Sequence, residues 1–343
     1  MRAILVGEDQ TLTWSKVPDP VPEDGQILVD VHATALNRAD LLQREGNYPP
    51  PPGWPEWMGL EVAGVVVTAP DGCRWKAGDK VCALLGGGGY AQRVAVPADM
   101  AVRVPGGLSM VEAAAIPEAF TTSYLNLCIE GGMKAGDTVL IQAGASGLGI
   151  AAIQLAKALG ATVMTTVSTE EKAEFVRALG ADIVVNRTVD NLGAAMEEHP
   201  VDVALDCIAG PDLGRCVERM AIGGRWIVIA TLGGAMSEVN MNTFFRRGIK
   251  LIGSTLRSRS SKMKAEILAH LEKTLWGSFS SGAIKPVIYR TLPITQADEA
   301  HTILQRRENI GKVVLTVNGC AHRHSKAELL KPAATTRKSF TPQ

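Results

Sequence analysis

Two patterns of hydrophobic and polar residues divide the chain. From residue 138 onward, short apolar β-branched runs alternate with segments in which apolar residues recur at helical spacing. The strand-like runs cover 138–143, 162–167, 183–186, 202–208, 225–232 and 250–256. The helical patterns between them cover 148–159, 170–179, 191–198 and 211–221. Six strands joined by helical crossovers predict an α/β domain with a doubly wound parallel sheet of the Rossmann type.

The N-terminal third has a different pattern. Short strands at 27–33, 61–67 and 91–96 are separated by clusters of proline and glycine, which is typical of a mainly β, barrel-like domain. After the sixth strand of the α/β series, the sequence predicts helices over 262–275 and 296–307 and a strand over 312–317. We expect this last segment to return and complete the first domain.

The turn after the first strand of the α/β series is rich in glycine, with Gly144, Gly147 and Gly149 preceding a helical pattern. Strand, tight turn and helix in this order predict a cradle for a dinucleotide diphosphate, because glycines allow close approach and a helix N-terminus offers free N–H groups. The spacing is Gly-x-x-Gly-x-Gly, which departs from the commonest fingerprint, Gly-x-Gly-x-x-Gly. The residues predicted to hold the diphosphate are Ser146, Gly147, Leu148 and Gly149.

These patterns together predict a division of the chain. Residues 1–118 form the first part of a catalytic domain, 119–257 a dinucleotide-binding domain, and 258–318 the part that completes the catalytic domain. The segment 319–343 lacks hydrophobic periodicity, and we expect it to be disordered.

The residues after the second strand favour NADPH over NADH. An NAD site usually has an acidic side chain at this point, whereas this strand ends at Ser168 without a carboxylate. Ser168, Lys172 and Arg187 offer the donors and cations that a 2′-phosphate needs. The acidic pair 170–171 leaves NADH open if the strand ends later, although acidic residues also favour the first turn of a helix.

Residues after the later strands are further candidates for contact with the cofactor, because ligands bind at the carboxyl ends of such strands. Ile208 follows the fourth strand, Thr231 the fifth, and Leu256 and Arg257 the sixth.

Composition and charge narrow the class of protein. The chain has 46% hydrophobic residues, no apolar run of the ~18 residues that a membrane span needs, and no signal-peptide pattern at its N-terminus. Its six cysteines include no Cys-x-x-Cys pair, so we expect a reduced, cytoplasmic protein. Residues 319–343 carry five basic and one acidic residue, which leaves 30 basic and 34 acidic residues elsewhere. The net negative charge of residues 1–318 argues against a nucleic-acid partner, which would need a cluster of basic residues.

Several motifs make the chain resemble the zinc-free quinone oxidoreductases of the medium-chain dehydrogenase/reductase superfamily over about residues 1–318. They are Ala35-Leu-Asn-Arg-Ala-Asp40, Gly59-Leu-Glu-Val-Ala-Gly64, Gly78-Asp-Lys-Val81, Gly89-Tyr-Ala-Gln92, the turn from Ala143 to Gly149, and Asn309-Ile-Gly-Lys312. The zinc dehydrogenases of this superfamily have a cysteine and a histidine where this chain has Asn37 and Leu60. Neither residue is a usual zinc ligand, so we expect no metal.

The resemblance implies hydride transfer from NADPH to a quinone or another conjugated carbonyl, an acceptor that delocalises the arriving charge without a metal. It also implies roles for individual residues: Asn37 and Asp40 beside the nicotinamide, Tyr48 in the acceptor pocket, Thr122 at the carboxamide, and Asn309 and Lys312 closing over the cofactor. Local roles in packing or capping remain open for Asn37, Asp40, Tyr48 and Thr122.

Two other functions stay open at this stage. One is an enoyl-thioester reductase with the same hydride chemistry. The other is a catalytically weak NADPH-binding protein, crystallin-like or RNA-binding. We also expect a homodimer, because the strand at 250–256 lies at an edge of the predicted sheet and uncovered edges tend to pair.

Overall fold

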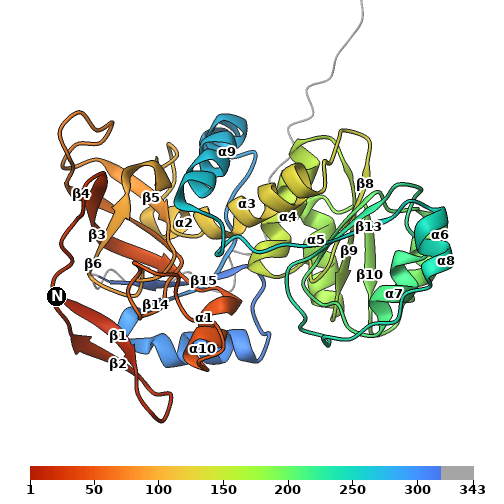
Figure 1. The fold of residues 1–343 in the computed structure, drawn as a ribbon, viewed down its shortest axis with the longest axis horizontal. Helices are drawn as coiled ribbons and strands as arrows, with labels where there is room; N and C mark the ends of the chain where they lie inside the picture. The colour runs from red at the N-terminus through yellow and green to blue at the C-terminus, as the bar shows by residue number, and fades with distance from the viewer. Residues whose placement is uncertain (318–343) are drawn as a thin grey trace, which may run out of the picture.

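The computed structural model describes residues 1–317, which form two lobes (Figure 1). One lobe contains a six-stranded parallel sheet in the order β10-β9-β8-β11-β12-β13. Its strands are β8 (Thr138–Ile141), β9 (Thr162–Val167), β10 (Ile183–Asn186), β11 (Val203–Asp206), β12 (Arg225–Val228) and β13 (Lys250–Gly253). The predicted doubly wound sheet is therefore confirmed. Strand order reverses between β8 and β11, and such a reversal opens a crevice at the carboxyl ends of the strands.

Helices α4 (Gly147–Ala158), α5 (Glu170–Leu179), α6 (Leu192–Glu198), α7 (Asp212–Val217) and α8 (Met241–Arg246) connect these strands. Their ends follow local sequence signals. The Ser146 hydroxyl accepts a hydrogen bond from the Gly149 N–H at 3.0 Å, and Thr169 caps α5 in the same way. Gly180 ends α5 with φ of 112°, in the left-handed region that favours glycine.

The other lobe is built on a seven-stranded sheet in the order β14-β15-β3-β4-β5-β7, with β6 also pairing with β3. Its strands are β3 (Gln26–Ala35), β4 (Glu61–Thr68), β5 (Lys80–Leu84), β6 (Arg93–Pro97), β7 (Ala101–Arg103), β14 (Ile288–Pro293) and β15 (Lys312–Thr316). β15 runs antiparallel to β3, so the C-terminal segment joins the N-terminal sheet, as the blue and red ribbons in Figure 1 show. A hairpin of β1 (Arg2–Val6) and β2 (Leu12–Lys16) lies beside it.

The remaining helices link and cover the two sheets. They are α1 (Arg38–Arg44), α2 (Met110–Ala113), α3 (Pro117–Tyr124) with the π-helical turn η2 (Leu125–Glu130), α9 (Ser261–Ser281) and α10 (Ala297–Gln305), with short 3-10 turns at η1 (Ala98–Met100) and η3 (Ile294–Gln296). α3 packs against both α4 and α9, and the rings of Phe120 and Phe279 meet edge to face at 4.9 Å. No helix within residues 1–317 is long and apolar enough to cross a membrane.

Four predicted strands of the parallel sheet extend beyond the observed ones. β8, β11, β12 and β13 end two to four residues before the predicted ends at 143, 208, 232 and 256. The apolar residues beyond each strand line a cavity between the lobes, so they prolong the hydrophobic pattern without belonging to the sheet. The short strands β2, β5, β7 and β14 were not predicted. The expected disordered tail at 319–343 lies outside the described residues.

Candidate functional site

A cavity of about 360 Å³ lies between the two lobes, at the carboxyl edge of the parallel sheet. Most of the residues predicted from sequence line it, although they come from every part of the chain. These are Asn37, Tyr48, Thr122, Ser146, Gly147, Leu148, Ser168, Lys172, Arg187, Ile208, Leu256, Arg257, Asn309 and Lys312. Three others, Asp40, Gly149 and Thr231, do not.

The three exceptions have local explanations. The carboxylate of Asp40 is fully buried and accepts hydrogen bonds from the Asn37 N–H, the Gly59 N–H and the Tyr90 hydroxyl, so it holds the start of α1 in place. Burial raises the pKa of Asp40 to about 6. Gly149 faces the inside of its own turn, and a Cβ there would lie 2.4 Å from the Ala143 carbonyl oxygen. Thr231 is exposed because β12 ends at Val228 and the two residues after Val228 occupy the cavity wall.

The turn before α4 is held by the C-terminal segment. The Gly311 N–H donates to the Ala145 carbonyl at 2.9 Å, and a Cβ on Gly147 would lie 2.3 Å from Cδ of Lys312. Gly147 is therefore required for the approach of Lys312. Gly147 and Leu148 occupy the first turn of α4, where N–H groups have no partner within the helix. These two amides can bind an anion at the cavity wall.

Basic side chains gather where β9 and β10 end. Lys172, Arg187 and Arg307 line this end of the cavity, and the Lys172 ammonium donates to the Arg307 carbonyl at 2.7 Å. Burial and then the nearby Arg187 lower the pKa of Lys172. Among residues 1–317, six basic residues and one acidic residue, Glu118, line the cavity. Such an imbalance favours an anionic ligand.

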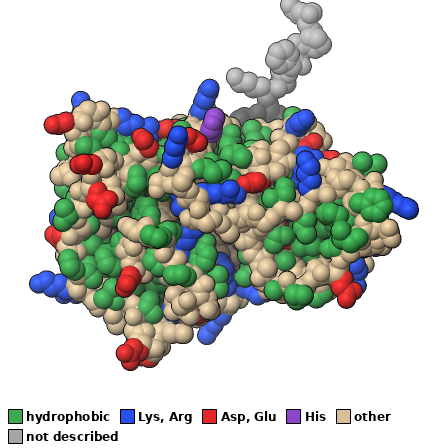
Figure 2. All heavy atoms as spheres, viewed as in Figure 1, with side chains coloured by type: hydrophobic (Ala, Val, Ile, Leu, Met, Phe, Trp, Pro, Cys, Tyr) green, Lys and Arg blue, Asp and Glu red, His purple; other side chains and the backbone are tan. Residues whose placement is uncertain are grey.

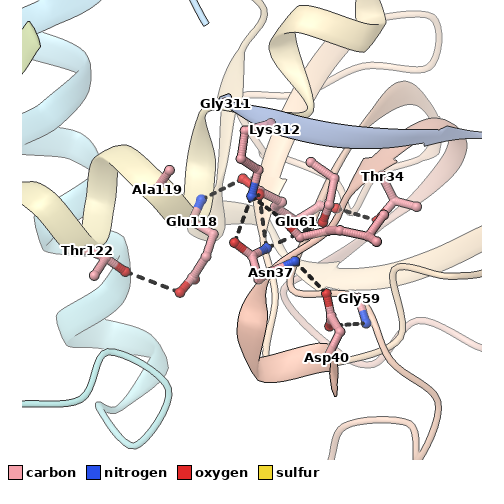
Figure 3. A network of polar contacts seen from close by, with 12 residues as sticks. Thr34, Asn37, Asp40, Gly59, Glu61, Glu118, Ala119, Thr122, Gly311 and Lys312 are labelled. Atoms are coloured by element: carbon pink, nitrogen blue, oxygen red, sulfur yellow. Dashed lines mark hydrogen bonds and ion pairs between the residues drawn. The ribbon is translucent and has the colours of Figure 1, made fainter. Parts of the chain in front are cut away.

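A buried ion pair joins β4 to β15 at the wall of the cavity (Figure 3). The Lys312 ammonium lies 2.6 Å from Oε1 of Glu61, and it also donates to the Asn37 amide oxygen at 2.7 Å and to the Leu36 carbonyl at 2.6 Å. The Asn37 amide nitrogen donates to Glu61 Oε1 at 3.0 Å. Both ends of the Asn37 amide are thus engaged, which fixes the orientation of this side chain.

Glu118 enters the same network from α3. Its backbone N–H donates to Glu61 Oε2 at 2.8 Å, and its carboxylate accepts from the Thr122 hydroxyl at 3.1 Å (Figure 3). Burial and the neighbouring Glu61 raise the pKa of Glu118 to about 7. This carboxyl group therefore exchanges its proton close to neutral pH.

The opposite wall is formed by Tyr48 and Arg257. The guanidinium lies 4.5 Å above the Tyr48 ring and donates to the Tyr48 carbonyl, the Gly86 carbonyl and the Gln43 side chain at 2.7 to 3.1 Å. Arg257 thus holds three segments of the wall together while lining the cavity. Burial raises the pKa of the Tyr48 phenol, which stays protonated at neutral pH.

Sequence reasoning gave no role to Glu61, Glu118, Arg38, Asn126 or Arg307, although all but Glu61 line the cavity. Glu61 stood inside a recognised motif, Gly59-Leu-Glu-Val-Ala-Gly64, and Glu118 lies four residues before Thr122. Arg307 lies two residues before Asn309. Within residues 1–317, no group of three or more His, Cys, Asp or Glu side chains could hold a metal ion.

Comparison with known proteins agrees with this geometry. Residues 23–106 match the alcohol dehydrogenase GroES-like domain, and residues 147–273 match the zinc-binding dehydrogenase domain. The chain is 31% identical to the human quinone oxidoreductase over 92% of this chain and 97% of that protein. The structure of the quinone oxidoreductase from Thermus thermophilus, also solved in complex with NADPH, is 29% identical, with a TM-score of 0.78 over 92% of this chain and all of that one. The JamJ enoyl reductase is 26% identical, with a TM-score of 0.79 over 92% of this chain and 98% of that one.

The two sheets and the cavity between them define a two-domain oxidoreductase. The chain belongs to the medium-chain dehydrogenase/reductase superfamily, in which its relatives include the quinone oxidoreductases.

Proposed function

We propose that the protein is an NADPH-dependent, zinc-independent reductase that transfers hydride to quinones or other conjugated carbonyl acceptors. The observation that carries this proposal is the cavity itself. Its outer end, where β9 and β10 end, is lined by Ser168 and by the basic residues Lys172, Arg187 and Arg307. Its inner end is lined by apolar residues and by a few polar ones, among them Tyr48, Glu118 and Arg257. A phosphorylated dinucleotide and a flat, weakly polar acceptor match these two ends.

The residues on the wall fit NADPH. The free amides of Gly147 and Leu148 would hold the diphosphate, and the basic cluster would hold the 2′-phosphate. We further propose that residues 1–118 and 258–318 form the catalytic domain and residues 119–257 the dinucleotide-binding domain. This division is supported by β14 and β15, which belong to the same sheet as the N-terminal strands.

Bound NADPH would supply the hydride, and the chain would supply position. Asn37 is held by Lys312 and Glu61, and Tyr48 is held by Arg257, so the two walls of the inner cavity are rigid. Rigid walls that keep donor and acceptor face to face can replace much of the action of a metal. The Asn37 amide is already engaged at both ends with neighbouring side chains, which supports chemistry without zinc at this position.

The test is stopped-flow oxidation of NADPH against a panel of quinones and a crotonyl thioester. We expect turnover with quinones, and treatment with EDTA should not lower it. Tyr48→Phe should lower the rate, because it removes a hydroxyl that can bind the acceptor oxygen. Turnover with the thioester alone would favour the second candidate, an enoyl-thioester reductase, which the likeness to the JamJ enoyl reductase supports. Loss of quinone turnover on removal of stoichiometric zinc would reject the metal-free proposal.

We also propose a homodimer formed through the edge of the parallel sheet. β13 is the edge strand, and Leu251 on it is 44% exposed, close in sequence to the 65% exposed Phe245 on α8. Figure 2 shows hydrophobic side chains gathered on the lobe of the parallel sheet. An exposed strand edge beside apolar surface favours pairing with a second copy.

Light scattering should therefore give twice the chain mass of 36.4 kDa at micromolar concentration. Leu251→Glu should shift the protein toward monomer, whereas Val189→Glu, at an exposed residue beyond the opposite edge strand β10, should not. A monomeric wild-type protein would refute the proposal.

A further inference from the structure

One acidic side chain, Glu118, lines the described cavity. It projects from the first turn of α3, and the hydrogen bond from its backbone N–H to Glu61 anchors that turn. The Thr122 hydroxyl, one helical turn later, donates to Oε1 of Glu118 (Figure 3). The other carboxyl oxygen, Oε2, receives no hydrogen bond from residues 1–317. A ligand in the cavity can therefore contact this oxygen.

The other polar groups at the inner end are poor sources of a proton. The Lys312 ammonium already donates to three acceptors at 2.6 to 2.7 Å, and one of them is the buried carboxylate of Glu61. The Arg257 guanidinium donates to three segments of the wall. The Tyr48 phenol has a pKa above its ordinary value because it is buried, which makes it a weaker acid.

We propose that Glu118 is a catalytic residue, the general acid that protonates the acceptor as hydride arrives. This inference rests on the proposed function. The acceptor gains hydride with its electron pair, and negative charge develops on the acceptor oxygen. The O–H bond of Glu118 then breaks and a new O–H bond forms on the product, which leaves Glu118 as a carboxylate. As the product leaves, solvent enters and the Glu118 carboxylate takes up a proton from the medium, so each turnover consumes one proton.

The charges around Glu118 suit this role. Burial and Glu61 raise its pKa to about 7, while Lys312, the Thr122 hydroxyl and Lys264 lower it. The charged or titratable groups that face Glu118 are Glu61 from β4, Lys312 from β15, Lys264 from α9, Arg257 after β13 and Tyr48 after α1. An acid with a pKa close to the working pH is both protonated often enough and strong enough to donate.

Kinetics over a range of pH test the role. Glu118→Gln should lower kcat about 10²- to 10⁴-fold with little change in the KM for NADPH. In the wild-type protein kcat should fall as pH rises through about 7. In the wild type, the hydrogen bond from Thr122 lowers the pKa of Glu118. Thr122→Val removes this hydrogen bond, so the pKa should rise and the fall in kcat should move to higher pH. The control is Glu174→Gln on the exposed side of α5, which should leave the profile unchanged. A Glu118→Gln protein with the wild-type kcat and pH profile would overturn the proposal.

Urea unfolding supplies a second readout, without cofactor or turnover. The pKa of Glu118 is raised in the folded protein, so below its ordinary value near 4.5 the group is protonated in both the folded and unfolded states. As pH rises from there to about 7, the unfolded state loses its proton first and the wild type loses stability. The urea midpoint of Glu118→Gln should rise relative to wild type over this interval. If the urea midpoints of the two proteins keep the same difference over this pH interval, the proposal is wrong. Absence of turnover in the wild type with every acceptor would overturn the proposed function as well.

Discussion

Replacing Lys312 with methionine is expected to destabilise the protein by about 3–5 kcal/mol, because it leaves the carboxylate of Glu61 buried without its cation. Glu61 is fully buried and Lys312 is 6% exposed, so water cannot replace the lost partner. The same change frees the Asn37 amide oxygen, and activity should fall together with stability. Urea unfolding at pH 7 measures the first effect, and steady-state rates measure the second.

Two further variants show whether the ion pair is the cause. Adding Glu61→Gln to Lys312→Met removes the stranded charge, and it should restore part of the lost stability. Lys273→Met on α9 changes an exposed lysine and should have little effect. A loss below about 1 kcal/mol for Lys312→Met would show that Glu61 is not dependent on this cation.

Removing Arg187 and Lys172 together is expected to raise the KM for NADPH about 10- to 100-fold while the KM for NADH stays nearly constant. A charge-assisted hydrogen bond contributes about 1.5–3 kcal/mol, and each 1.4 kcal/mol corresponds to a tenfold change. Both side chains line the cavity where β9 and β10 end. Of the two nucleotides only NADPH carries a 2′-phosphate, and the proposed function places that phosphate beside these side chains. Steady-state titrations with the two nucleotides measure the ratio.

Arg177→Ala is the matched control, because Arg177 lies on the same helix as Lys172 but pairs with Glu170 and does not line the cavity. It should change neither constant. Equal losses for NADPH and NADH in the double variant would place the 2′-phosphate elsewhere and remove the basis for the NADPH preference.

Local patterns were sufficient for the architecture of the parallel sheet. β-branched runs, helical periodicity and capping residues such as Ser146, Thr169 and Gly180 act over a few residues, so the order of strands and helices could be predicted. The ends of β12 and β13 could not, because residues that line a cavity are as apolar as residues in a sheet. This ambiguity also misplaced Thr231, which is exposed.

The chemistry of the inner cavity was decided by tertiary structure. Asn37 and Lys312 are 275 residues apart, and their contact depends on β15 pairing with β3. The pKa of Glu118 depends on burial and on charged groups from several other elements. The sequence around Glu118 does not show which groups these are. For the parallel sheet, sequence alone determined the order of strands and helices and which loops meet at one edge. Only the tertiary structure determined which charged and polar side chains meet in the buried network around Lys312 and Glu118. The physical reason is that electrostatic energy depends on distance and burial rather than on order along the chain.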